Sequence, residues 1–160
     1  MTTIIPCSAL RSRCNMGPLT AGLITMGLVL GSVPKGLAAE ALTVRVAGLS
    51  EPSGHVMISL YDGAEAFEAG DDEALQRERL PVGGDLDVVW NVKGLAPGDY
   101  GVALFHDVDD DEVLDTNFVG VPKEPYGFSN DARGRFGPPD YDAITFAFDG
   151  SSLAITINAK

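Results

Sequence analysis

The sequence predicts an all-β fold, an antiparallel β-sandwich of about seven strands that forms a single domain over residues 42–160. Apolar and polar residues alternate with a period of two in several short stretches, as expected of strands with one buried face. Turn-forming residues separate these stretches, and the strand–helix–strand spacing of a parallel sheet is missing. Of the 160 residues, 45% are hydrophobic and 21% are charged, which is the composition of an ordinary globular protein.

The first two strands are expected at residues 42–47 and 56–60. In both, every second residue is apolar: Leu42, Val44 and Val46 in the first, and Val56, Ile58 and Leu60 in the second. Residues 50–54 between them include a proline and a glycine, which favour a turn. The two strands are therefore interpreted as a hairpin.

The later strands show the same alternation. They are expected at residues 86–92, 100–107, 143–148 and 153–157. Trp90 lies in phase with the apolar residues of its strand and is assigned to the core. An Asp-Gly turn at 149–150 predicts that the last two strands form a second hairpin. In the acidic connection before residue 83, a short helix is expected, capped by Asp71 or Asp72 and running to Arg79.

Residues 1–41 are expected to be a secretory signal peptide that is cleaved. Arg11 and Arg13 precede an uncharged apolar stretch at residues 16–33, and an A-x-A cleavage pattern follows at residues 39–41. The alternative is a membrane anchor, but the apolar stretch is short and interrupted by glycine and proline. The mature chain is therefore expected to be exported, to the periplasm or the extracellular space, without stable insertion into the membrane.

The chain is strongly acidic, with a formal net charge of -12 at pH 7. The predicted leader contains three basic residues and one acidic residue, so the mature chain is more acidic still. This charge argues against nucleic acid and anionic lipid as partners and is compatible with cations and basic partners. Both cysteines, Cys7 and Cys14, lie in the predicted leader, so no disulfide is expected in the mature domain.

The densest chemical signal is the acidic run at residues 107–115. Four aspartates fall at positions 1, 3, 5 and 9 of a calcium-type loop: Asp107, Asp109, Asp111 and Asp115. Position 6 is Glu112 instead of glycine and position 12 is Phe118 instead of glutamate, so the loop is not an EF-hand. The sequence predicts a Ca²⁺ ion bound by the four aspartates and no organic cofactor. The alternative is a solvated acidic loop.

Residues 117–142 are too rich in glycine and proline for regular structure and too aromatic for a flexible linker. They are expected to form a long ordered loop that packs on the domain. Four of its rings are the candidate binding surface, for stacking on a sugar or a peptide: Tyr126, Phe128, Phe136 and Tyr141. The interpretation favoured over this one is that these rings only cover an open end of the core, and Phe118 is expected to pack on the domain as well.

Several motifs together resemble a bacterial family known as domain of unknown function 2141. They are the turn at 95–100, the Phe105-His106-Asp107 triplet with the acidic loop behind it, Gly120-Val121-Pro122-Lys123-Glu124, Gly127-Phe128-Ser129-Asn130 and Phe136-Gly137-Pro138-Pro139. The resemblance covers essentially the whole chain after the predicted leader. It implies an exported bacterial β-sandwich similar in outline to immunoglobulin-like, transthyretin-like or carboxypeptidase-regulatory-like domains. It implies no particular activity.

The sequence offers little support for catalysis. His55 and His106 are the only histidines, and the patterns of nucleophilic triads and of zinc proteases do not occur. The predicted function is a non-catalytic envelope or secreted module, stabilised by calcium, that binds an unknown macromolecule or glycan of the cell envelope. The alternative is a carbohydrate-binding domain, or a carbohydrate-active enzyme that uses a pair of carboxylates.

Overall fold

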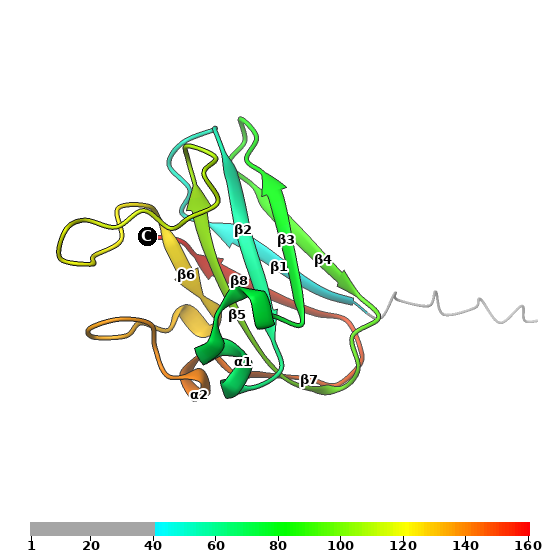
Figure 1. The fold of residues 1–160 in the computed structure, drawn as a ribbon. Coiled ribbons are helices and arrows are strands. Elements are labelled where there is room, and N and C mark those ends of the chain that lie inside the picture. Colours follow the sequence, from blue (N-terminus) through cyan, green and yellow to red (C-terminus); the bar gives the residue numbers. More distant parts are fainter. Residues whose placement is uncertain (1–40) are drawn as a thin grey trace, which may run out of the picture. The chain divides into compact units, whose positions relative to one another are not determined.

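The computed structural model describes residues 41–160, which belong to one compact unit. The predicted signal peptide lies outside these residues except for Ala41, so its cleavage stays a prediction. Within the described part of the chain, most regular structure is β-strand, arranged in two sheets, and the helices are short (Figure 1). The all-β class is therefore confirmed. No helix in residues 41–160 is long and apolar enough to cross a membrane.

The smaller sheet has three strands in the order β4-β1-β8, which span Val88–Lys93, Ala41–Ala47 and Leu153–Asn158. The larger sheet has the order β3-β2-β5-β6, with strands at Gln76–Pro81, His55–Tyr61, Gly98–Asp107 and Tyr126–Phe128. A further strand, β7 (Phe146–Phe148), pairs with the first residues of β5. β1 and β8 run parallel, whereas the other pairs are antiparallel. The expectation of a wholly antiparallel arrangement was therefore wrong at this pair.

Both predicted hairpins are wrong. β1 pairs with β4 and β8, whereas β2 pairs with β3 and β5, so the turn at 50–54 connects the two sheets. At the other end of the chain, β7 pairs with β5 and β8 pairs with β1. The period-two pattern reports that a strand has one buried face, but it contains no information about which strand lies beside it.

The helix predicted from residue 71 to Arg79 is also wrong. A short helix, α1, occurs earlier, at Ala64–Ala69, and a single 3-10 turn follows at Asp71–Glu73. Residues 76–81 form β3, which pairs along its whole length with β2. Cross-strand pairing at the edge of the sheet has overridden the helical propensity of this charged segment.

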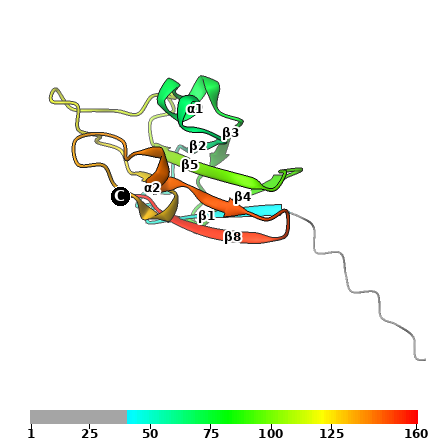
Figure 2. The ribbon, with the colours of Figure 1, turned by 90° about the horizontal axis from the view of Figure 1, so that it is seen from below.

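Both sheets contribute side chains to one hydrophobic core, which includes Trp90 as expected from the sequence. In β2 the even-numbered residues Val56, Ile58 and Leu60 belong to this core. Three odd-numbered residues of β2, Met57, Ser59 and Tyr61, are buried as well, although they point to the opposite face. Figure 2 shows that α1 lies on this second face, away from β1 and β8. The outer face of the larger sheet is therefore covered, and a cleft forms there.

Candidate functional site

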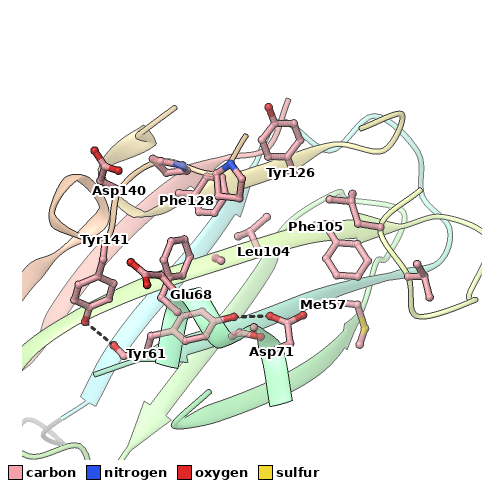
Figure 3. A pocket seen from close by; sticks show the side chains of 18 of the residues that line it. Met57, Tyr61, Glu68, Asp71, Leu104, Phe105, Tyr126, Phe128, Asp140 and Tyr141 are labelled. Carbon is pink, nitrogen blue, oxygen red and sulfur yellow. Dashed lines mark hydrogen bonds between the residues drawn. The ribbon is translucent and has the colours of Figure 1, made fainter. Parts of the chain in front are cut away.

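The cleft has a volume of about 680 Å³ (Figure 3). Its floor consists of outward-pointing residues of β2 and β5: Met57, Ser59, Tyr61, Ala103 and Phe105. Its walls come from α1, from β6, from residues 112–114 of the acidic loop and from residues 138–141. Residues that are distant in the sequence therefore meet over a rigid sheet.

Aromatic rings form a packed cluster on one side of this cleft. Phe67 of α1 contacts Tyr61, Phe128 and Tyr141, with ring centroids 5.3, 6.1 and 6.0 Å apart. Tyr126 meets Phe128 at 6.0 Å with its ring turned by 77°. These rings meet mostly edge to face, so they do not form one flat platform. Phe128 has only 9% of its surface exposed and serves mainly to support its neighbours.

Three of the four predicted surface rings, those of Tyr126, Phe128 and Tyr141, line this cleft. Phe136 does not: it lines an adjoining groove of about 560 Å³, between residues 114–122 and 134–138, which shares the lining residues Tyr126 and Phe128 with the cleft. Phe136 is 94% exposed and Phe118 is 100% exposed. The expectation that both rings pack on the domain is therefore wrong. Phe118 lies in a tight turn in which the amide of Gly120 bonds the carbonyl of Asn117, so its ring is carried away from the core.

The Gly-Phe-Ser-Asn motif holds the cleft together. Along one edge, β5 pairs with β7 at residues 98–100 and with β6 at residues 103–105, and Ser129 bridges the break between them. The Ser129 hydroxyl accepts the amide of Val102 at 2.9 Å and donates to the carbonyl of Ile144 at 2.5 Å. The Asn130 side chain donates to the carbonyl of Thr145 at 2.9 Å. The motif thereby fixes the short helix α2 (Tyr141–Ile144) on the sheet.

Gly101 allows α2 to approach the sheet closely. A Cβ atom at this position would lie 2.7 Å from Cδ1 of Ile144 and 3.0 Å from Cε2 of Tyr141. The Tyr141 hydroxyl donates to the carbonyl of Tyr61 at 3.2 Å, so this ring is fixed at the edge of the cleft. The sequence predicted Tyr126, Phe128 and Tyr141 as candidate rings but missed Tyr61, Phe67 and the role of Gly101.

The cleft is acidic. Four carboxylates line it, those of Glu68, Asp71, Glu112 and Asp140. No lysine, arginine or histidine of residues 41–160 lines it. Asp71 accepts a 2.5 Å hydrogen bond from the Tyr61 hydroxyl. Burial, together with Asp71, raises the pKa of Tyr61 well above its usual value. Burial, followed by the charge of Asp62, also raises the pKa of Tyr141.

The acidic loop folds around Asp107, whose side chain is fully buried. Its carboxylate accepts the amides of Asp111 at 3.2 Å and Glu112 at 3.0 Å. Glu112 has a φ of 64°, in the left-handed region. This is position 6 of the predicted calcium-type loop, where an EF-hand has glycine for the sharp turn. The chain therefore makes a turn at this position with glutamate instead of glycine.

Carboxylate oxygens of Asp107, Asp109 and Glu124 lie within 4.8 Å of one another. The sequence reasoning missed Glu124, because its place depends on a loop that folds back through the Thr116–Pro122 bridge. The Glu124 carboxylate is held by the amides of Val108 and Asp115, at 2.9 and 3.0 Å.

Two predicted ligands, Asp111 and Asp115, lie outside this group of three. Asp111 accepts the amide of Val113 at 2.8 Å, and Asp115 lies 3.4 Å from the ammonium group of Lys123. Desolvation, followed by repulsion from Asp111, raises the pKa of Asp109. The structure therefore brings together two of the four predicted ligands and adds Glu124.

The acids of this region differ in their ion pairs. Asp110 pairs with His55 at 2.5 Å and with Arg79 at 3.0 Å, and Glu112 lies 3.8 Å from the same arginine. By contrast, none of the three converging carboxylates pairs with a basic side chain anywhere in residues 41–160. Within residues 41–160, the negative charge of this group, like that of Asp111, is therefore not balanced by a basic side chain.

Comparison with known proteins identifies the family of the chain. No match was found among the curated proteins or among the solved structures. The sequence model of one family, described as an uncharacterized protein conserved in bacteria (DUF2141), matches residues 44–156, which confirms the resemblance seen in the motifs. The chain belongs to this bacterial family.

Proposed function

We propose that the protein is an exported, non-catalytic binding module whose ligand site is the cleft over β2 and β5. The observation that carries this proposal is the convergence of α1, β6 and residues 138–141 on one cleft, lined by rings and carboxylates. Its volume of about 680 Å³ falls within the range of small-ligand pockets, roughly 300 to 1,000 Å³. The proposed ligand is a chemical group that belongs to a macromolecule or glycan of the cell envelope.

The finer fold proposed for the module is a β-sandwich of the immunoglobulin or transthyretin type. The support is the single core to which both sheets contribute, since two sheets that share a core pack face to face. The proposed site lies on the outer face of the larger sheet, which positions the helix and the loops that form its walls.

We also propose that the acidic loop binds Ca²⁺, with Asp107, Asp109 and Glu124 as ligands. Backbone amides alone stabilise the fully buried carboxylate of Asp107, and no basic side chain of residues 41–160 pairs with this group, so a cation would lower the cost of burying its charge. Carboxylate oxygens suit a hard cation, and Ca²⁺ takes six to eight oxygens, so carbonyl groups and water would complete its shell. The role proposed for the ion is structural.

The alternative of sugar stacking receives less support. Stacking on a sugar needs an open ring face, whereas the rings here pack edge to face against one another, at 82° for Tyr61 with Phe67. A carbohydrate-active enzyme would in addition need two carboxylates placed on either side of a bound sugar. We therefore propose binding without catalysis.

Export is expected to remove about the first 41 residues. Intact-mass measurement of the protein recovered from the periplasm or the medium of a bacterial host should give a chain that begins near Leu42. The reason is the order of a charged segment, an apolar stretch and an A-x-A site. Recovery of the chain with Met1 still attached, in the membrane fraction, would contradict the expectation.

Ligand binding at the cleft is expected to be detectable with small probes. A panel of p-cresol, N-acetylglucosamine and n-butylguanidinium is titrated into ¹⁵N-labelled protein, and amide shifts are followed by NMR. At least one probe should cause saturable shifts at residues 57–61, 103–105 and 126–128. Phe105→Ala should weaken that probe about fivefold, because part of the apolar contact is lost.

The matched control is Phe118→Ala, which removes a fully exposed ring outside the cleft and should leave the affinity unchanged. The proposal fails if no probe gives saturable shifts, or if both variants weaken binding equally.

A further inference from the structure

We propose that the cleft selects an organic cation, a protonated amine or a guanidinium carried on a short apolar stem. This inference rests on the proposed function only in taking the cleft as a ligand site. The chemical class of the ligand follows from the charges, the aromatic rings and the apolar side chains that line the cleft.

The carboxylates of the cleft are only partly balanced by basic side chains. Asp71 and Glu112 are partly balanced from outside the cleft, by Arg77 and Arg79 of β3, each at 3.8 Å. Glu68 and Asp140 have no ion pair with any residue of 41–160. Because no basic side chain of residues 41–160 lines the cleft, the field of its carboxylates is negative and attracts a cation from solution.

Aromatic rings near the carboxylates can add to the attraction of a cation. A guanidinium or ammonium group is attracted to an aromatic face within about 6 Å, and more strongly where water is excluded. The protein already makes such a contact beside the cleft, where the guanidinium of Arg133 lies 5.1 Å from the centroid of the Tyr126 ring. In Figure 3, Glu68 lies at the same end of the cleft as Tyr61 and Tyr141. Tyr61 is buried, so a cation at that end lies beside the Glu68 carboxylate and the partly exposed Tyr141 ring.

Apolar side chains of the cleft can bind the alkyl part of the ligand. The lining also includes the apolar side chains of Met57, Phe105, Val113 and Leu114, and in Figure 3 Met57 and Phe105 lie at the end of the cleft away from Glu68. An alkyl chain is stabilised there by burial, at about 0.8 kcal/mol for each methylene group that leaves water. A ligand with a charged head and an apolar stem therefore matches both ends of the cleft, whereas a bare metal ion matches only one.

Other occupants are less favourable on the same grounds. An anionic ligand is repelled by four carboxylates, and a second copy of this chain brings its own net charge of -12. The raised pKa of Tyr61 agrees with this: burial is its main cause, and Asp71, a carboxylate of the cleft, raises it further.

The test compares n-butylguanidinium with n-butylurea, which has nearly the same shape but no charge. Both are titrated into ¹⁵N-labelled protein in saturating calcium, so that the acidic loop is occupied before the probe is added. The guanidinium should bind at the cleft about tenfold more tightly than the urea, and the difference should shrink as ionic strength rises. Glu68→Gln and Asp140→Asn should each weaken the guanidinium by about fivefold and leave the urea unchanged.

The matched control is Glu65→Gln, which removes an exposed charge on α1 that does not line the cleft. If guanidinium and urea bind equally at the cleft, the inference of a cation is overturned while the cleft remains a ligand site. If Glu65→Gln weakens the guanidinium as much as Glu68→Gln, the attraction is only that of the whole acidic surface, and the inference fails. If neither these two probes nor those of the earlier panel shift residues of the cleft, the proposed function fails as well.

Discussion

Replacing Ser129 by alanine is expected to lower the free energy of unfolding by about 3 kcal/mol. The variant leaves the amide of Val102 and the carbonyl of Ile144 without the partner that the hydroxyl supplies. Each buried polar group without a partner costs about 1 to 3 kcal/mol, and Ser129 is fully buried, so water does not replace the hydroxyl freely. Urea unfolding, followed by the fluorescence of the buried Trp90, measures the loss.

Ser151→Ala is the matched control for this variant. Ser151 is exposed and bonds only to the neighbouring Asp149 carboxylate, so its loss should change stability by less than about 0.5 kcal/mol. If Ser129→Ala unfolds at the same urea concentration as the unchanged protein, the serine does not hold α2 and β5 together as the geometry indicates.

Calcium is expected to raise the melting temperature by an amount on the order of 10 °C when present at a hundredfold excess over its Kd. Binding to the folded state alone contributes RT ln(1 + [L]/Kd), about 2.7 kcal/mol at that excess. For a domain of this size, 1 kcal/mol corresponds to roughly 2 to 8 °C in Tm. Thermal unfolding in excess Ca²⁺ and in chelator gives the shift directly.

Asp109→Asn should abolish most of this calcium response, because it removes one of the three converging carboxylates. In chelator the same variant should be at least as stable as the unchanged protein, since repulsion among the carboxylates is relieved. Asp142→Asn, at an exposed aspartate of α2, is the control and should respond to calcium normally.

Asp111→Asn separates the set of ligands predicted from sequence from the set seen in the structure. It should keep the calcium response, because Asp111 lies outside the group that contains Glu124. A melting temperature that is equal in calcium and in chelator means that the loop is only a solvated connection.

The sequence pattern predicted the positions of most strands but not which strands pair with one another. Alternation located β1, β2, β4 and β5 because each has a face in the core. Partners depend on how the chain crosses between sheets, and no local pattern records this, so both predicted hairpins failed. The prediction for residues 76–81 failed because an edge strand with exposed charges lacks the apolar alternation that marks a strand.

The candidate sites show the same division between local and distant information. Asp107 and Asp109 are separated by one residue, and their role as a pair was visible in the spacing. Glu124 joins them only after the loop closes, and a lone glutamate beside proline residues gives no signal of its own. Likewise Tyr126 and Tyr141 were recognised as candidate surface rings, whereas the place where they meet depends on α1 and on Gly101.

The parallel pairing of β1 with β8 has a kinetic consequence. The register joins Leu42 to Leu153 and Ala47 to Asn158, so the contacts of the smaller sheet span almost the whole domain. Contacts between residues so far apart in the sequence form only after a large loop has closed, and closing this loop costs conformational entropy. Folds rich in such contacts therefore form in milliseconds to seconds instead of microseconds. The central strand of the smaller sheet is near the beginning of the domain, yet it has only one neighbour, β4, until the last strand arrives. A nascent chain that lacks residues 153–158 therefore presents β1 as an open edge, and completion of this sheet is a late event in folding.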